Sequence, residues 1–314
     1  MTKPALLSFH NNGPKGLDDL AAHFDIIKLW DGADLEKALQ NRTDDIKAIN
    51  CTVNHDINAD LINRLPNLEM IATFSVGYDH IDLDVCKARN IKVSYTPDVL
   101  NEETADTGLA LLLATAKRVV ESDQFIRDGK WQDWNHMPLG TSLKDKTIGI
   151  VGLGSIGQQA AKRCAAFDMH VVYYGPNEKP QFDYRYYDDL MAMARDCDFM
   201  MLTCALNDQT RHLITTDVLE ALGADGILIN IARGGVVDES ALIKALQDDT
   251  ITGAGLDVFA CEPNVPDTLK ALDNVVLLPH IGSATIETRT KMGQIVVDNL
   301  LAYAKDEALS APLL

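Results

Sequence analysis

The stretch TIGIVGLGSIG, residues 147–157, decides the fold. TIGIV has the composition of a buried strand, and GLGSIG matches the G-x-G-x-x-G pattern that joins a strand to a helix at a dinucleotide site. The helical segment QQAAKRCAAF follows at once. In this pattern Gly152 permits a tight turn, Gly154 lets a pyrophosphate approach the backbone, and Gly157 lets the helix pack closely on the strand. This context favours a phosphate-binding loop over the alternative, a glycine-rich turn without a ligand.

Apolar runs of strand length continue on both sides of this loop. Downstream, five more runs alternate with helical segments, at Val171–Tyr174, Phe199–Thr203, Gly226–Ile231, Thr252–Val258 and Val275–Leu278. Upstream, five runs occupy residues 5–9, 26–30, 46–53, 68–75 and 91–95. Such alternation indicates parallel sheets with helices packed on them. We therefore predict an α/β protein with two Rossmann-like, doubly wound parallel-sheet domains, namely a flavodoxin-like substrate domain and a dinucleotide-binding domain of six strands.

Two helical segments mark the crossings between these domains. Residues 101–129 begin in an acidic turn at Glu102 and Glu103 and carry an apolar face, which predicts one long helix. Residues 286–303 also have a helical period and are expected to pack on the first domain. The predicted substrate domain therefore comprises residues 1–100 and 286–314, and the dinucleotide-binding domain comprises residues 101–285.

Composition narrows the classes of function. The net charge of −18 disfavours a nucleic-acid partner, which requires a basic face. We expect a cytoplasmic protein without membrane attachment, because the chain has no apolar stretch of about 18 residues and begins without the pattern of a signal peptide. The six cysteines are scattered without C-x-x-C pairs, so we expect reduced thiols and no metal site.

Three polar residues follow three of the apolar runs in the second half of the chain. Arg233 follows ILINIA, Glu262 follows GLDVFAC, and His280 follows VVLLP. Ligands of open α/β sheets lie at the carboxyl ends of the strands, so these side chains are expected to meet there. Reduction of a 2-keto acid needs a proton donor, which an imidazole supplies, a carboxylate that orients the imidazole, and a guanidinium that binds a carboxylate or keto oxygen. Taken singly, each has a structural alternative, such as a surface turn for the arginine or a solvated loop for the glutamate.

The residues after the second strand of this domain bear on the choice of cofactor. In NAD-specific versions an acidic residue about 20 residues after the glycines binds the ribose hydroxyls. Here the strand ends in Gly175, Pro176 and Asn177, and no acid occurs before Glu178. This pattern favours NADP(H), with NAD(H) as the alternative. Asn177 and Lys179 are the candidate contacts, although an exposed turn without a ligand explains them equally well.

Six blocks of the sequence resemble the D-isomer-specific 2-hydroxyacid dehydrogenases over nearly the full chain. They are SVGYDHID, TPDVLNEETAD, VGLGSIG, LINIARGGVVDESAL, GAGLDVFACEP and LLPHIGSAT. The resemblance implies that Arg233, Glu262 and His280 are the catalytic set, and that Arg233 and His280 also contact the substrate. Within that family, the chain looks most like the NADPH-using glyoxylate, hydroxypyruvate and hydroxyphenylpyruvate reductases.

The same resemblance implies further binding residues and a partner. Backbone N–H groups of Val76 and Gly77 are implied to bind the substrate carboxylate, and Asp257 to hold the nicotinamide carboxamide. Further cofactor contacts are implied at Thr104, Ser155, Ile156, Thr203, Cys204, Thr210, Ile231, Ala232 and Gly282. The resemblance also implies a homodimer built on the cofactor domains.

The leading hypothesis is an enzyme that moves a hydride from NAD(P)H to a small 2-keto acid and gives a D-2-hydroxy acid. Larger aromatic acids stay open as substrates if His10, Phe74, Met137 and the segment from Trp131 to Trp134 line an apolar pocket. The alternative is a nucleotide-sensing, corepressor-like binding protein of the same fold. The chain lacks the disordered extensions or basic patch that such a protein uses to recruit partners.

Overall fold

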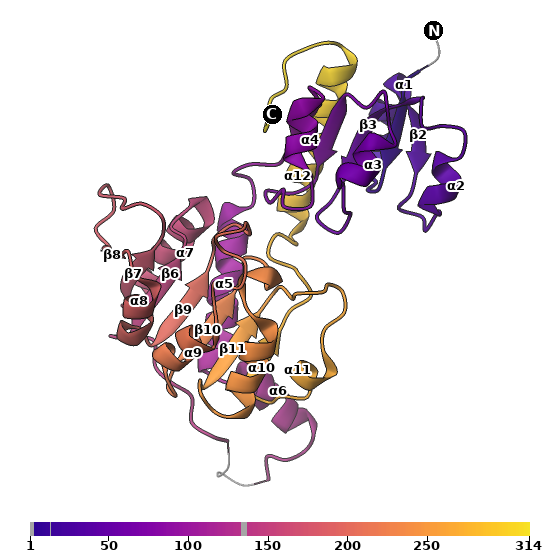
Figure 1. The fold of residues 1–314 in the computed structure, drawn as a ribbon. Coiled ribbons are helices and arrows are strands. Elements are labelled where there is room, and N and C mark those ends of the chain that lie inside the picture. The colour runs from indigo at the N-terminus through magenta and orange to yellow at the C-terminus, as the bar shows by residue number, and fades with distance from the viewer. Residues whose placement is uncertain (1–2, 13, 133–136) are drawn as a thin grey trace. The chain divides into compact units, whose positions relative to one another are not determined.

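The computed structural model describes residues 3–12, 14–132 and 137–314. The chain forms two compact units, the first from residues 1–100 with 284–314 and the second from residues 101–283. Both units are α/β, with one parallel sheet each (Figure 1). The predicted fold class is therefore confirmed.

Unit 1 is built on five parallel strands in the order β2-β1-β3-β4-β5. The strands are β1 (Ala5–Ser8), β2 (Asp25–Lys28), β3 (Ile46–Cys51), β4 (Met70–Thr73) and β5 (Lys92–Ser94). The helices are α1 (Pro14–His23), α2 (Leu35–Leu39), α3 (Ala59–Asn63), α4 (Leu83–Ala88) and α12 (Ile286–Ala304). β1 and β4 are buried along their whole length, as strands covered on both faces must be. This strand order is the flavodoxin-like one, in which the winding direction reverses between β1 and β3.

Helix α12 belongs to unit 1. It packs against α1 and β4, and its apolar side chains Met292, Val296, Val297 and Leu300 are buried. The C-terminal segment of the chain therefore completes the first unit.

Unit 2 contains a seven-stranded parallel sheet in the order β12-β11-β10-β9-β6-β7-β8. The strands are β6 (Thr147–Val151), β7 (His170–Tyr174), β8 (Arg185–Tyr187), β9 (Phe199–Leu202), β10 (Ile227–Asn230), β11 (Gly253–Leu256) and β12 (Val275–Leu277). The helices are α5 (Asn101–Ala116), α6 (Val119–Arg127), α7 (Ser155–Ala166), α8 (Leu190–Asp196), α9 (Thr216–Leu222), α10 (Glu239–Gln247) and α11 (Asp267–Lys270). One core packs α5 and α7 on the sheet and another packs α8, α9 and α10. This is the order of a dinucleotide-binding fold with one strand added at its β12 edge.

Two sequence predictions for unit 2 were wrong in detail. The sheet has seven strands rather than six, because the three-residue strand β8 pairs with β7 at the edge and is too short to give a periodic signal. The expected helix over residues 101–129 is two helices, which break at Arg118, where the backbone is left-handed with φ 54°. The Ala116 carbonyl accepts a hydrogen bond from the Thr141 N–H at 2.8 Å, so a returning segment takes the place of the next helical turn.

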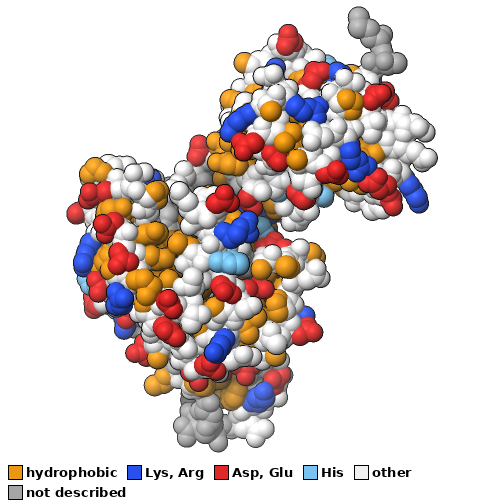
Figure 2. All heavy atoms as spheres, in the orientation of Figure 1, with side chains coloured by type: hydrophobic (Ala, Val, Ile, Leu, Met, Phe, Trp, Pro, Cys, Tyr) orange, Lys and Arg blue, Asp and Glu red, His pale blue; other side chains and the backbone are white. Residues whose placement is uncertain are grey.

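The side-chain chemistry of the surface is mixed. On the face drawn in Figure 2, acidic and basic side chains are interspersed on both units. All six cysteines are free thiols. A search of the described residues finds no cluster of potential metal ligands, and within them no helix is both long and apolar enough to span a membrane.

Candidate active site

The glycine-rich loop lies between β6 and α7 in unit 2. Gly152 has φ 95°, and a Cβ there would lie 2.8 Å from the Cα of Cys204, so only glycine fits this turn. A Cβ on Gly157 would press on the Gly152 carbonyl and lie 2.8 Å from Thr203 Oγ1. Around a Cβ on Gly154, by contrast, nothing lies within 4 Å, and this residue caps the N-terminus of α7. Open space in front of free helical N–H groups fits a pyrophosphate.

Lys179 fastens the turn after β7 to this loop. Its Nζ donates to the Leu153 carbonyl at 2.7 Å, and its backbone N–H donates to the hydroxyl of Tyr173 at 2.7 Å. Asn177 lies exposed in the same turn. The two candidate contacts therefore differ, since Lys179 is held beside the glycine-rich loop and Asn177 faces solvent.

Arg233 lies in the turn that follows β10. The side chain of Asn230 holds this turn, because its Nδ2 donates to the Arg233 carbonyl at 3.0 Å and its Oδ1 accepts from the Ala232 N–H at 3.0 Å. Gly234 lets the turn approach the loop after β11, since a Cβ there would collide with the backbone of Phe259. The Arg233 guanidinium donates through Nη1 to the Ala232 carbonyl at 2.8 Å.

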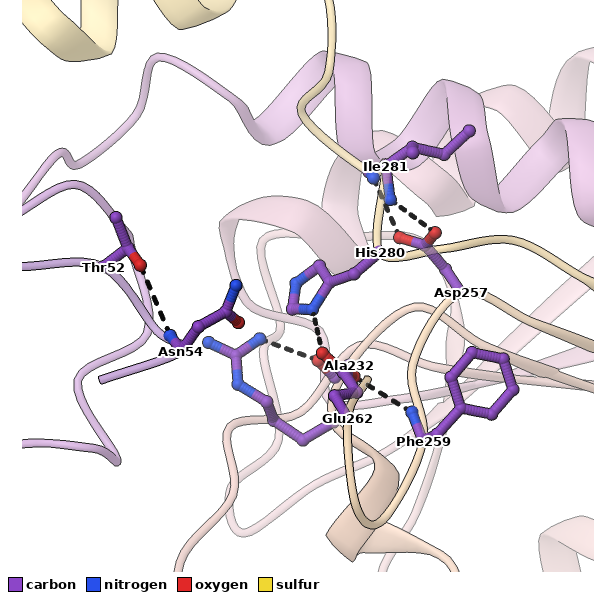
Figure 3. A network of polar contacts seen from close by, with 10 residues as sticks. Thr52, Asn54, Ala232, Asp257, Phe259, Glu262, His280 and Ile281 are labelled. Carbon is purple, nitrogen blue, oxygen red and sulfur yellow. Dashed lines mark hydrogen bonds and ion pairs between the residues drawn. The ribbon is translucent and has the colours of Figure 1, made fainter. Parts of the chain in front are cut away.

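The side chains of His280 and Glu262 lie within ion-pair distance of each other. His280 Nδ1 lies 2.7 Å from Glu262 Oε2, and the other carboxylate oxygen accepts from the Phe259 N–H at 3.0 Å (Figure 3). The two residues come from the loops after β12 and β11, so the sheet brings together groups 18 positions apart. Because Nδ1 is engaged by the carboxylate, Nε2 is the ring nitrogen left for a substrate.

Asp257 fixes the backbone at His280. Its carboxylate accepts from the Ile281 N–H at 2.7 Å and from the Gly282 N–H at 2.8 Å, and its carbonyl accepts from the His280 N–H at 2.9 Å (Figure 3). His280 has φ 54°, a left-handed conformation that is uncommon for a residue with a Cβ. These three hydrogen bonds hold the imidazole in that conformation. The sequence had not predicted this task for Asp257.

Two carboxyl groups at this site have shifted pKa values in opposite directions. Burial alone would raise the pKa of Glu262, but the hydrogen bond with His280 and the nearby charges of His280 and Arg233 outweigh burial and hold it below its usual value. Burial raises the pKa of Asp257 above its usual value, against the hydrogen bonds from Ile281 and Gly282 and the His280 charge. Glu262 is thus favoured as a carboxylate beside the imidazole.

The remaining predicted cofactor residues follow the carboxyl ends of the same strands or adjoin them. Thr203 and Cys204 follow β9 beside the glycine-rich loop, and Thr203 Oγ1 donates to the Gly152 carbonyl at 2.6 Å. Thr104 on α5 lies beside Gly282 and Asp257. The other members of the set lie in three places, with Ser155 and Ile156 in the first turn of α7, Ile231 and Ala232 after β10, and Thr210 in the turn after β9, where its hydroxyl donates to the Ala205 carbonyl at 2.7 Å.

Several predicted positions fall outside this cluster. Val76 and Gly77 belong to unit 1 and follow β4. Trp131 is exposed, and Trp134 lies outside the described residues. Asn230 was not predicted as a site residue; it is 1% exposed and holds the turn of Arg233. A buried asparagine at the end of the apolar run ILIN was the available signal, because a buried amide requires hydrogen-bond partners.

Comparison with known proteins places the chain in a family. Residues 109–282 match the family model described as D-isomer specific 2-hydroxyacid dehydrogenase, NAD binding domain. The chain is 43% identical over 296 residues to glyoxylate/hydroxypyruvate reductase A HPR2 of Arabidopsis thaliana, covering 94% of each, and 40% identical over 295 residues to hydroxyphenylpyruvate reductase of Plectranthus scutellarioides, again covering 94% of each. A solved NADPH-dependent glyoxylate/hydroxypyruvate reductase of Sinorhizobium meliloti, in complex with NADP and malonate, is 36% identical with a TM-score of 0.90, over 99% of this chain and 97% of that one.

The fold and the cofactor loop define an NAD(P)-dependent oxidoreductase. The chain belongs to the D-isomer-specific 2-hydroxyacid dehydrogenase family and is similar to its glyoxylate/hydroxypyruvate reductases. The resemblance drawn from the six sequence blocks is confirmed.

Proposed function

We propose that this protein reduces small 2-keto acids, with glyoxylate and hydroxypyruvate first, to D-2-hydroxy acids. The observation that carries the proposal is the pair of His280 and Glu262, 2.7 Å apart at the strand ends of a dinucleotide-binding unit. An imidazole that keeps one nitrogen on a carboxylate and offers the other is a proton donor suited to a developing alkoxide. The named activities of the similar reductases agree with this chemistry.

Each residue then has a task in the reaction. When bound, the reduced nicotinamide supplies a hydride to the keto carbon. His280 gives a proton from Nε2 to the keto oxygen as the carbonyl becomes an alcohol, and Glu262 stabilises the imidazolium that precedes this transfer. Arg233 binds the carboxylate or the polarised keto oxygen. The step balances, because the hydride brings two electrons and one hydrogen to the carbonyl carbon and His280 brings one proton to its oxygen, which together convert the carbonyl group to an alcohol.

The residues that bind the substrate carboxylate and the nicotinamide are assigned by resemblance to the family. The backbone N–H groups of Val76 and Gly77 bind the substrate carboxylate, and Asp257 receives the nicotinamide carboxamide. An anion held by backbone N–H groups is a frequent arrangement after a strand of an α/β sheet. The first unit is accordingly the substrate domain, and the second is the cofactor domain.

For the cofactor we favour NADP(H), with NAD(H) as the alternative. The turn after β7 contains Gly175, Pro176 and Asn177, so it lacks the acid that binds the ribose hydroxyls of NAD and would repel a 2′-phosphate. Asn177 is free to reach a ligand, and Lys179 brings a positive charge to the loop side of the turn.

The assembly proposed is a homodimer through the cofactor units. Helix α6 buries none of its residues within the chain. Val119, Val120 and Ile126 on this helix are exposed by 52%, 53% and 58%, and Trp131 beyond it by 56%. Apolar and tryptophan side chains presented together in this way are typical of a contact with a partner.

A steady-state panel tests the function. The purified protein is assayed with glyoxylate, hydroxypyruvate and phenylpyruvate, each with NADPH and with NADH, by following absorbance at the wavelength of the reduced nicotinamide. We expect turnover with the two small acids, a higher kcat/KM with NADPH, and the D isomer of the hydroxy acid from hydroxypyruvate, whose product is chiral. Binding of NADPH without turnover of any of these acids would instead support the nucleotide-sensing alternative.

A further inference from the structure

The carboxyl edge of the sheet in unit 1 carries a polar cluster that the proposed function leaves unexplained. Asn50 on β3 is fully buried, and its Nδ2 donates to Ser8 Oγ and to the His10 carbonyl, both at 2.7 Å. These bonds tie the end of β3 to the segment that leaves β1. β1 and β3 are the strands between which the winding direction reverses, the place where open α/β sheets bind ligands.

The imidazole of His10 is held on two sides. Its Nδ1 lies 2.8 Å from Asn12 Oδ1 and 3.1 Å from the Asn12 backbone nitrogen, and the tautomer decides which of the two it bonds. Its ring packs against Phe74 with tilted planes, at 4.4 Å between the ring centroids and 30° between the planes. Nε2 is therefore the remaining polar atom of a ring whose orientation is fixed, and the ring is only half-buried.

The surroundings of His10 favour a neutral ring. Burial lowers the pKa of His10, and the charge of Arg289 lowers it further against the hydrogen bond with Asn12. The Arg289 guanidinium lies over the ring of Phe74, which is the aromatic neighbour of His10, at 5.4 Å from the ring centroid. A neutral imidazole nitrogen suits a hydroxyl group, which accepts or donates a hydrogen bond as the tautomer requires.

The cluster also lies within reach of the residues assigned to the substrate carboxylate. Phe74 precedes Val76 by two residues, and Ser75 Oγ donates to the Gly77 carbonyl at 2.6 Å, so the segment is ordered by its own hydrogen bond. Two residues of extended chain span roughly 7 Å. The ring contact of His10 with Phe74 therefore places the imidazole close in the fold to the backbone assigned to the substrate carboxylate.

The contact between His10 and Phe74 bears on which group at the third carbon of the substrate the protein accepts. The imidazole of His10 packs on the Phe74 ring with tilted planes, so one neighbour of this aromatic side chain is a polar ring. The similar reductases are named for acids that differ only beyond the keto carbon, from a hydrogen in glyoxylate to a hydroxymethyl group in hydroxypyruvate and a phenolic group in hydroxyphenylpyruvate. A residue that distinguishes these groups must meet the third carbon of the substrate.

From this geometry we propose that His10 determines substrate specificity, because its Nε2 forms a hydrogen bond with a hydroxyl on the third carbon of the 2-keto acid. The inference rests on the proposed function and deepens it. It assigns the chain to short keto acids with a polar third carbon, ahead of glyoxylate and of aromatic acids.

The test compares two substrates in one protein. In His10→Leu, kcat/KM for hydroxypyruvate should fall about tenfold, the value of one lost hydrogen bond to an uncharged group, while kcat/KM for glyoxylate, which has no third carbon, stays near the wild-type value. His10→Gln keeps a polar group at the position and should recover part of the loss. His23→Leu, at the end of α1 and so beside the amino ends of the strands, is the matched control and should leave the ratio unchanged.

The outcomes separate this inference from the function beneath it. If the ratio of kcat/KM for hydroxypyruvate to kcat/KM for glyoxylate is unchanged in His10→Leu, the role of His10 is overturned. Turnover of both acids by the wild-type protein would still support the proposed reductase. If His10→Leu does not fold, His10→Gln decides: a partial fall of kcat/KM for hydroxypyruvate relative to glyoxylate supports the proposal, and an unchanged ratio overturns it. Absence of wild-type turnover with either acid would remove both the function and the inference.

Discussion

The carboxyl edges of the two sheets differ in charge. In unit 2, Arg233, Glu262 and His280 bring a guanidinium, a carboxylate and an imidazole to the ends of β10, β11 and β12, with 2.7 Å between the last two. In unit 1, the edge carries hydroxyl, amide and imidazole groups, with Thr73 Oγ1 2.7 Å from Ser75 Oγ and 3.0 Å from His80 Nε2. One edge can develop and neutralise charge, and the other is suited to recognise a polar group.

Under the proposed function, the difference assigns different parts of one reaction to the two α/β units. Transfer of a hydride creates negative charge on oxygen, which requires an acid and a cation beside the reacting atoms. Recognition of a small polar substrate requires only fixed neutral donors and acceptors. Both edges obey the same rule of placement at strand ends, and the residue types decide what each edge does.

The largest expected effect comes from replacing the imidazole of His280 in unit 2, compared with replacing an imidazole in unit 1. His280→Ala should lower kcat by roughly 10²-fold or more, because it removes the proton donor. The control is His55→Ala on unit 1, where the ring contacts Thr52 Oγ1 at 2.9 Å and Phe9, and where kcat should change little. Stopped-flow and steady-state assays with hydroxypyruvate measure both. Equal losses in the two variants would erase the distinction between the edges.

A second prediction concerns the cation of unit 2. Arg233→Ala should lower kcat/KM for keto acids roughly 10- to 100-fold, the range for hydrogen bonds from a charged donor, without weakening NADPH binding. Titration of NADPH fluorescence checks the second part. Arg211→Ala is a matched control, because that arginine is exposed near Gly235 in the same neighbourhood. A parallel loss of NADPH affinity in Arg233→Ala would mean that the arginine serves the fold or the cofactor.

The smallest expected effect is on stability and depends on pH. The pKa of Glu262 is lowered in the folded protein, so its carboxylate stabilises the fold above the ordinary pKa of a glutamate, and this contribution is lost as pH falls through the lowered value. Glu262→Gln should therefore reduce the free energy of unfolding by about 1 kcal/mol at neutral pH. The gap to wild type should close below roughly pH 4. Urea unfolding at several pH values measures it, and a gap that stays constant with pH would contradict the ion pair.

Some of the site follows from local sequence. The turn at Gly152 needs a positive φ and leaves no room for a Cβ beside Cys204, so the glycine in the motif GLGSIG could be read from the sequence as a turn. Arg233, Glu262 and His280 each follow an apolar run, and strand ends of a parallel sheet share one edge, so their meeting was predictable. The polar cluster at the edge of unit 1 was not, because histidine, asparagine and serine side chains carry no pattern until the partners are known.

What the sequence by itself determined is therefore the class of fold, the cofactor loop and the family. These are written in strand-length apolar runs and in glycines that the backbone requires locally. Only the tertiary structure decided that Asp257 holds His280 in a left-handed conformation and that Asn230 holds the turn of Arg233. It also decided that the helix breaks at Arg118 and that the ring of His10 packs against Phe74. The physical reason is that these features depend on hydrogen bonds and ring contacts between residues that the chain separates and the sheet brings together.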